Sequence, residues 1–207
     1  TTFLFFYDPM TDTVVALPKT STVNTVAVRT SFFDANGDLW VSNRNNQYGK
    51  LDVENQTVVN PVVLSGIRPS TLSKMGSTTY AIDRNNPRFG TFDTTSLQFT
   101  SIAPLVCCGL NIVNDGTTMY LVAQQSISTI NTTTGARGTT HTLTPAGQEI
   151  SEMRFLGTTL YASSGPRGGP GGGQNVLVSI NPTTGAIATV HTFPVGTFIS
   201  GLEVFNP

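Results

Sequence analysis

Charged side chains are scarce in this sequence, which holds 11 Lys plus Arg and 12 Asp plus Glu among its 207 residues. Ordinary soluble domains contain about 25% charged residues, whereas this chain contains 11%. A formal net charge of −1 offers no strong attraction to nucleic acid or to an anionic membrane. We therefore expect no nucleic-acid partner and a surface built from neutral polar residues.

Long hydrophobic runs are also missing. No stretch of about 18 apolar residues occurs, which excludes a transmembrane helix and predicts no insertion into a membrane. The amino end lacks a basic segment followed by an apolar one, so we expect that any secretion signal has been removed. No apolar stripe with helical spacing extends over three turns, whereas β-branched residues abound, with 33 threonines. The composition predicts one all-β domain over residues 1–207.

A repeat of about 41 residues organises the chain. Four segments place an aromatic residue on a short apolar strand after a small polar turn, with spacings of 40, 40 and 41 between Trp40, Tyr80, Tyr120 and Tyr161. A second series places Asp or Asn at the end of an apolar strand, with spacings of 44, 41, 38 and 50 between Asp8, Asp52, Asp93, Asn131 and Asn181. The last spacing is longer because GPRGGPGGG is inserted between the two markers of that unit.

Each unit is expected to contain four short strands. In the third full unit they are predicted at residues 109–113, 118–123, 126–130 and 139–143. Four-stranded units of about 40 to 45 residues, repeated four to eight times, are typical of a β-propeller. Since 207 residues hold about five such units, we predict a five-bladed β-propeller with four-stranded blades.

The Asp and Asn residues of the second series are interpreted as turn formers and not as ligands. Their side-chain oxygens can accept hydrogen bonds from backbone N–H groups two residues further along. Gly135 and Gly185 lie where a residue in the left-handed conformation would close such a turn.

The two chain ends meet where one unit is incomplete. In the preferred interpretation, TTFLFF acts as a second strand and the ring closes by pairing strands from the two ends of the chain. In the alternative, FLFFYD is a third strand and its blade lacks a second strand. Such a gap would leave backbone groups unpaired and invite a strand from another chain.

Segments such as LWVSN at Trp40, and NDGTTMYLVA followed by ISTINTTTG, resemble the secreted bacterial propeller repeats of the YVTN and NHL type. The resemblance covers nearly the whole chain. It implies a binding or scaffold protein that is secreted or displayed on the cell surface, which is more common with such repeats than an enzyme.

Cysteine and histidine, which often carry chemistry, are few. Cys107 and Cys108 are adjacent, which argues against zinc; oxidation outside the cell would give a vicinal disulfide, and the alternative is two separate thiols. His141 and His191 occupy equivalent places on successive fourth strands, too far apart to share a metal. We predict no metal and no cofactor.

Acidic residues are the remaining candidates for catalysis. Glycosidase chemistry needs two opposed carboxylates, and lactonase-type propellers hold a divalent cation in the central channel. Most Asp residues fall in predicted turns, so the remaining candidates are Asp83, Glu149, Glu152 and Glu203. The three Glu residues lie beside predicted innermost strands. No complete ligand set can be assigned, so the chain is predicted not to be an enzyme. A metal-dependent lactonase-type hydrolase is one alternative.

Loops between second and third strands are the best candidates for a binding surface. NRNNQYG and DRNNPRFG occupy equivalent places in two successive units. Amides, guanidinium groups and rings of this kind bind sugar hydroxyls and sugar faces. GPRGGPGGG lacks the ending and the helix of a phosphate loop, but it exposes an arginine. The candidate binding residues are Arg44, Asn45, Asn46, Tyr48, Arg84, Asn85, Asn86, Arg88, Phe89 and Arg167.

The composition favours a structural role. A weakly charged surface tolerates dense packing, so the first hypothesis is an extracellular structural or adhesive propeller that assembles with copies of itself or with glycan or matrix at a cell surface. A lectin-like glycan-binding propeller is the alternative. Asn55 and Asn131 begin N-x-T sequons on equivalent turns and are candidate glycosylation sites.

Overall fold

The computed structural model describes residues 5–8, 11–16, 28–34, 36–43, 45–55, 57–106, 110–123, 125–146, 148–166 and 175–194, except the side chains of residues 5–7, 16, 28, 29, 110, 148, 149, 151 and 166. Every regular element that these residues form is a β-strand, which confirms the predicted all-β class. The described residues contain no helix long and apolar enough to cross a membrane.

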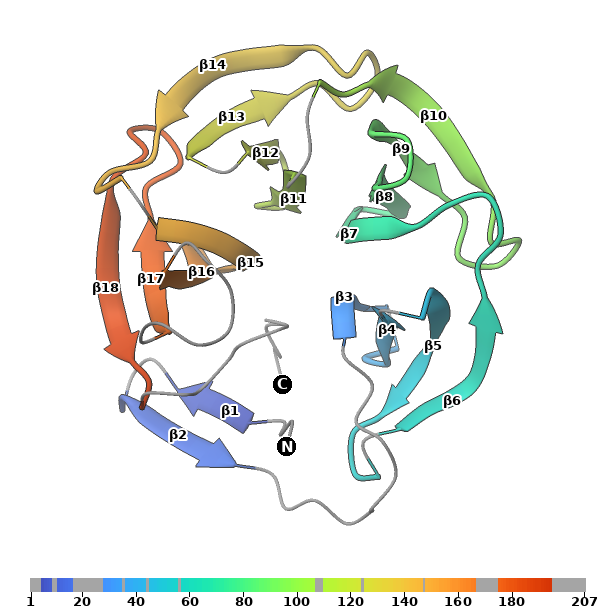
Figure 1. Ribbon diagram of the computed structural model, residues 1–207, viewed down its shortest axis with the longest axis horizontal. Coiled ribbons are helices and arrows are strands. Elements are labelled where there is room, and N and C mark those ends of the chain that lie inside the picture. Colours follow the sequence, from blue (N-terminus) through green and yellow to red (C-terminus); the bar gives the residue numbers. More distant parts are fainter. Residues whose placement is uncertain are drawn as a thin grey trace.

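Four antiparallel four-stranded sheets stand around a common centre as the blades of a β-propeller (Figure 1). In each blade the strands follow one another from the innermost to the outermost position. The first two blades are β3 (Val28–Phe33), β4 (Leu39–Asn43), β5 (Gln47–Asp52) and β6 (Thr57–Val63), then β7 (Pro69–Met75), β8 (Thr78–Asp83), β9 (Arg88–Phe92) and β10 (Phe99–Pro104). The next two are β11 (Leu110–Asn114), β12 (Met119–Ala123), β13 (Ser126–Ile130) and β14 (Arg137–Thr142), then β15 (Gln148–Leu156), β16 (Thr159–Pro166), β17 (Val176–Ile180) and β18 (Ile187–Thr192).

A two-stranded sheet of β1 (Phe5–Asp8) and β2 (Thr13–Ala16) lies in the sector between β18 and β6 (Figure 1). The prediction of five four-stranded blades is therefore wrong, because the described residues form only four. The repeat spacing counts sequence units, and it cannot show whether each unit forms all four of its strands.

The hairpin corresponds to the outer half of a blade. Asp8 ends β1 as Asp52 ends β5, and β2 lies outside β1 as β6 lies outside β5 (Figure 1). Phe5 and Phe6 share one strand with Asp8, so the preferred interpretation of TTFLFF as a second strand is wrong at these two residues. The alternative, a third strand, is confirmed for residues 5–8; pairing between the chain ends lies outside the described residues.

The aromatic repeat marks one position of the second strand. In each blade this residue lies opposite a residue of the innermost strand, in the pairs Phe32–Trp40, Ser73–Tyr80, Val113–Tyr120 and Arg154–Tyr161. The spacing of about 41 residues is thus confirmed as the blade repeat.

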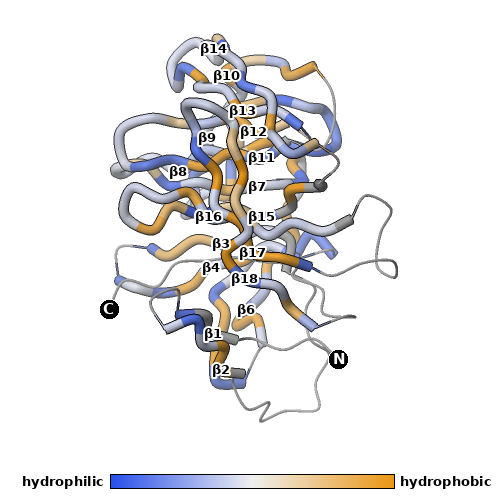
Figure 2. Tube along the Cα trace, turned by 90° about the vertical axis from the view of Figure 1, so that its left-hand side faces the viewer, coloured by the Kyte–Doolittle hydropathy of each residue, from blue (hydrophilic) through white to orange (hydrophobic). Residues whose placement is uncertain are grey.

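The hydrophobic core lies between neighbouring blades. Separate buried clusters join the first blade to the second, the second to the third, and the third to the fourth. A smaller cluster of Leu177 and Phe193, with Tyr161 and Val190 against it, lies in the fourth blade. In the edge-on view, hydrophobic segments follow the strands and the turns are more hydrophilic (Figure 2). Packing of blade against blade therefore fixes which face of each strand is buried.

Candidate functional site

The predicted turn formers act as expected. Asp93 Oδ1 accepts hydrogen bonds from the N–H groups of Thr95 and Ser96 at 2.8 and 3.0 Å. These bonds hold the pKa of Asp93 below its ordinary value. Asn131 and Asn181 accept the same pair of bonds in their turns. The side-chain oxygens of these Asp and Asn residues therefore accept hydrogen bonds that hold the turns.

Glycines close two of these turns as predicted. Gly135 and Gly185 have φ of 71° and 77°, in the left-handed region. A Cβ at Gly185 would also collide with the carbonyl oxygen of Thr142 in the neighbouring blade. The turn of the fourth blade is thus fitted against the end of β14.

Asn43 and Asp83 organise the two loops that carry the predicted binding residues. Asn43 Oδ1 accepts hydrogen bonds from the N–H groups of Asn45 and Gln47, both at 2.9 Å. Asp83 Oδ1 accepts them from Asn85 and Arg68, both at 3.1 Å. The equivalent positions predicted for NRNN and DRNN, between second and third strands, are confirmed.

Two of the predicted binding residues are held inside these loops. Asn46 donates from Nδ2 to the carbonyl oxygens of Leu64 and Ile67, at 2.7 and 3.0 Å. Arg88 lies 2.7 Å from a carboxylate oxygen of Asp83, whose side chain is 2% exposed, and its guanidinium group stands over the Phe99 ring. Both side chains stabilise the fold, so a ligand would have to compete for them.

The rings of Tyr48 and Phe89 are buried, with relative exposures of 2% and 0%. Tyr48 stacks on Trp40 and meets Phe92 edge-on, with ring centroids 5.3 and 5.5 Å away. Burial raises the pKa of Tyr48. The expectation that these rings lie on an exposed recognition surface is wrong, because both face the packing between blades and not the loop tip.

The other predicted binding residues divide into two groups. Asn45, Arg84, Asn85 and Asn86 are exposed at the loop tips and remain candidates. Arg44 and Arg167 lie outside the described residues, as do Cys107 and Cys108. Asn55 and Asn131 are exposed on equivalent turns between third and fourth strands, and their glycosylation stays a prediction.

The acidic candidates for a central site do not come together. Asp83 is paired with Arg88, and Glu152 lies buried on the innermost strand β15. Glu203 and the side chain of Glu149 lie outside the described residues. Within the described part of the chain, no group of three or more His, Cys, Asp or Glu residues is arranged to hold a metal ion.

Both histidines lie on fourth strands, as predicted. His141 pairs with Ile127, and His191 pairs with Leu177 at the corresponding place in the next blade. His191 Nδ1 is 2.7 Å from a carboxylate oxygen of Asp12 in the β1–β2 turn. This contact ties the hairpin to the fourth blade.

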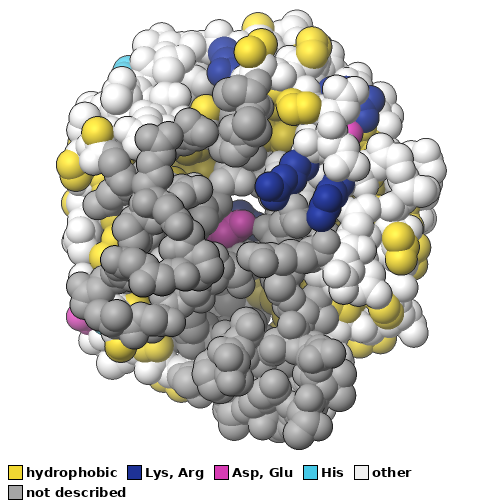
Figure 3. Space-filling view, viewed as in Figure 1, with side chains coloured by type: hydrophobic (Ala, Val, Ile, Leu, Met, Phe, Trp, Pro, Cys, Tyr) yellow, Lys and Arg dark blue, Asp and Glu magenta, His cyan; other side chains and the backbone are white. Residues whose placement is uncertain are grey.

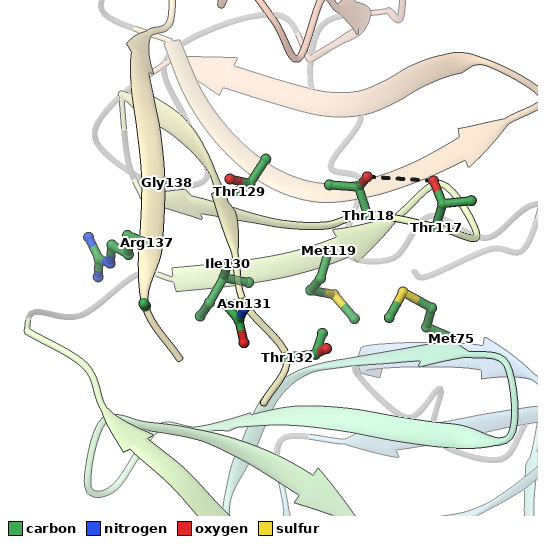
Figure 4. Close-up of a pocket in the computed structure, with 11 residues that line it drawn as sticks. Met75, Thr117, Thr118, Met119, Thr129, Ile130, Asn131, Thr132, Arg137 and Gly138 are labelled. Atoms are coloured by element: carbon green, nitrogen blue, oxygen red, sulfur yellow. Dashed lines mark hydrogen bonds between the residues drawn. The ribbon is translucent and has the colours of Figure 1, made fainter. Parts of the chain in front are cut away.

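An open hollow of about 520 Å³ lies between the second and third blades (Figure 4). Met75 and Met119 point toward each other within it, and Thr117 donates a hydrogen bond to, or accepts one from, Thr118 at its edge. Hydroxyl, thioether and amide groups line this space, and of the predicted site residues only Asn131 takes part.

Exposed hydrophobic side chains form a feature that was not predicted. All six large ones among the described residues are valines: Val14, Val15, Val59, Val62, Val63 and Val106. Five of them lie on the outermost strands β2 and β6, and we call these five the valine rim. Hydrophobic groups appear at the outer edge in the regions of β2 and β6 (Figure 3). The valine-rich TVVNPVV segment was the available signal, but its exposure depends on the strand being outermost.

No known family and no curated protein matches this sequence. Among solved structures, the chain is similar to the glutaminyl cyclase of Myxococcus xanthus, with a TM-score of 0.62, 15% identity, and coverage of 79% of this chain and 69% of that one. An extracellular domain from B. thetaiotaomicron, described as part of a hybrid two-component system, gives a TM-score of 0.51 and 14% identity over 92% of this chain and 25% of that one. Kuenenia stuttgartiensis hydrazine synthase gives 0.48 and 16%, over 84% and 51%. At these identities the likeness shows the β-propeller fold alone.

Proposed function

We propose that this protein is a non-enzymatic, extracellular β-propeller that acts as a structural or adhesive module by associating with copies of itself. The valine rim is the observation that carries this proposal. Exposed large apolar side chains that gather on one part of a soluble protein's surface can mark an interaction site. Here they follow the outermost strands, which are the unpaired edges of their sheets.

The charge of the chain supports association with copies of itself. A net charge of −1 and a charged fraction of 11% leave little electrostatic repulsion between molecules. Several side chains suited to binding a ligand instead stabilise the fold, since Asn46, Asp83 and Arg88 hold the loops together. Among the described residues, the alternative of glycan binding keeps the exposed loop-tip residues and has no aromatic platform from Tyr48 or Phe89.

Light scattering and negative-stain electron microscopy of the purified protein test this function. We expect the average mass to rise with concentration and ordered polymers to appear on the grids. Replacing Val62 and Val63 by Lys should suppress both, because charge is placed on the valine rim. Thr142→Lys is the matched control, since Thr142 pairs with the start of its third strand as Val63 does. Single rings at every concentration would overturn the proposal. Glycan arrays would then test the alternative of glycan binding.

A further inference from the structure

We propose that the hollow between the second and third blades binds an acidic saccharide, with Arg137 holding the carboxylate of a uronate unit. The inference goes beyond the proposed self-association and does not rest on it.

The hollow lies on one face of the ring. Thr117 and Thr118 come from the turn after β11, and Asn131 and Thr132 come from the turn after β13. Neighbouring strands of a blade are antiparallel, so these two turns lie on the same face and the loops after second strands lie on the other. The hollow is therefore separate from the loop tips that the sequence predicts to bind a ligand.

Arg137 breaks the internal repeat of the chain. It pairs with Ile130, the last residue before the turn-forming Asn131. The residues with the same pairing in the other three blades and in the hairpin are all apolar, namely Val58, Phe99, Ile187 and Val14. Of the described residues that line the hollow, only Arg137 is charged. A position that is apolar elsewhere in the repeat thus gives this hollow its positive charge.

The next residue also departs from the repeat. Gly138 follows Arg137 as Val15, Val59, Thr100 and Ala188 follow the equivalent apolar residues. A Cβ at Gly138 would collide with the hydroxyl oxygen of Thr129. The register between β13 and β14 shifts at the same place, between Ser128 and Ile130, and such bulges are common beside functional sites. Glycine therefore leaves room for the Thr129 hydroxyl in the wall of the hollow.

Several polar groups of the hollow are available to a ligand. The side chains of Thr129, Thr132 and Arg137 make no hydrogen bond or ion pair within the described part of the chain. Asn131 accepts two backbone hydrogen bonds at Oδ1, and its Nδ2 donors have no partner among the same residues. An arginine without an ion pair can bind a carboxylate through two parallel hydrogen bonds.

The lining favours a sugar acid over a bare anion. Met75, Met119 and Ile130 give the hollow an apolar part, whereas a sulfate or phosphate ion presents only oxygen atoms. Arg137 lies at one end of the hollow and Met75 at the other (Figure 4). A uronate offers a carboxylate to Arg137, hydroxyl groups to the threonines and Asn131, and C–H groups to the thioethers. The volume of about 520 Å³ is within the range of ligand sites.

Titration with digalacturonate, followed by NMR of the isotope-labelled protein, tests this site. The protein must carry no N-linked glycan, because a glycan on Asn131 would fill the same space. We expect the backbone signals of Asn131, Thr132 and Gly138 to shift. The methyl ester of the same disaccharide should bind at least about tenfold more weakly, because it has lost the charge that Arg137 recognises.

Variants identify the groups that bind. Arg137→Gln should weaken digalacturonate binding at least about tenfold, and Arg137→Lys should weaken it less because the charge remains. Gly138→Ala should also weaken it, since the added Cβ displaces the Thr129 hydroxyl. Lys50→Gln removes one positive charge from the first blade and is the matched control, which should bind like the wild type. Urea unfolding should show that all variants are folded.

The outcomes separate this inference from the proposed function. Equal binding of the acid and its ester would overturn the inference, as would equal losses in Arg137→Gln and Lys50→Gln. Sulfate that displaces digalacturonate at the same concentration would overturn the saccharide class, and unshifted signals at the hollow would overturn the site. Self-association is measured without saccharide, so its failure leaves this site standing, and failure of this site leaves self-association standing.

Discussion

Single side chains hold the turns between first and second strands in the first and third blades, with corresponding contacts in both. Asp34 Oδ1 accepts hydrogen bonds from the N–H groups of Asn36 and Asp38, and Oδ2 accepts one from the indole of Trp40 at 3.0 Å. Asp115 has the corresponding role with Thr117, Thr118 and the hydroxyl of Tyr120. In these two blades the aromatic marker of the repeat is thus joined to the turn that precedes it.

Replacing Asp34 by Asn should destabilise the protein at neutral pH more than in acid. Burial raises the pKa of Asp34, but hydrogen bonds from Asp38, Trp40 and Asn36 outweigh it and leave the pKa below 3.8. The stabilisation that depends on this carboxylate is therefore present above the unfolded-state pKa and is lost as the pH falls through the folded-state pKa. Asn retains one oxygen but places an N–H group against the indole, so we expect a loss of about 1–2 kcal/mol at pH 7.

Urea unfolding of the wild type and of Asp34→Asn at pH 7 and near pH 3 measures this difference. The gap between the two proteins should narrow in acid. Trp40→Phe, which removes one donor, should show part of the same loss. An equal gap at both pH values would contradict the assigned role of the carboxylate.

The same backbone hydrogen bond follows the outermost strand in each of the four blades. The backbone N–H of the first residue after each outermost strand donates to the residue that precedes the third strand, as in the pairs Leu64–Asn46, Leu105–Pro87, Leu143–Gln125 and Phe193–Asn175. All four donors are buried apolar residues. The outermost strands differ instead in their exposed side chains. Their surfaces can therefore serve different functions while the backbone contacts stay the same.

Pro61→Val should convert the interrupted edge of β6 into a more continuous one. Valine restores a backbone N–H and favours strand conformation, so extended strand pairing between molecules becomes easier. We expect faster growth of disordered or fibrillar aggregates, followed by thioflavin fluorescence and light scattering. Pro104→Val on β10 is the control, because Pro104 ends its strand and β10 itself contains no valine. Unchanged aggregation of Pro61→Val would show that the proline does not protect this edge.

The whole ring is joined by contacts between innermost strands. Leu72 donates its backbone N–H to Thr30 Oγ1 at 2.8 Å, and Asn114 donates to Ser73 Oγ at 2.8 Å. Arg154 of the fourth blade donates to the carbonyl oxygen of Ser31 in the first blade. This last contact spans the sector that holds the hairpin, and it connects the first and last complete blades.

Arg154→Met should weaken this connection. Methionine keeps much of the apolar side chain but removes every donor, so we expect the free energy of unfolding to fall by about 1–3 kcal/mol. Arg154→Lys keeps the charge and should lose less. Urea unfolding measures both variants, and an unchanged midpoint for Arg154→Met would contradict a role in holding the ring together.

Local patterns in the sequence are enough to predict the strands and turns of this protein. The β-branched composition and the hydrogen-bonding chemistry of Asp, Asn and Gly act over a few neighbouring residues, and the repeat of about 41 residues shows that the same local pattern recurs. For this reason the all-β class, the turn formers and the positions of both histidines follow from local patterns. The strands predicted for the third unit also agree with β11 to β14 within about two residues.

Side-chain burial, the number of complete blades and the exposed valines depend on how distant segments pack together. Burial of Tyr48 and Phe89 depends on neighbouring strands and on the next blade, so adjacent residues could not reveal it. The number of complete blades depends on which segments pair around the ring, and not on how many repeats the chain contains. The valine rim became a surface only because β2 and β6 are outermost, since the same valines in a central strand would belong to the core.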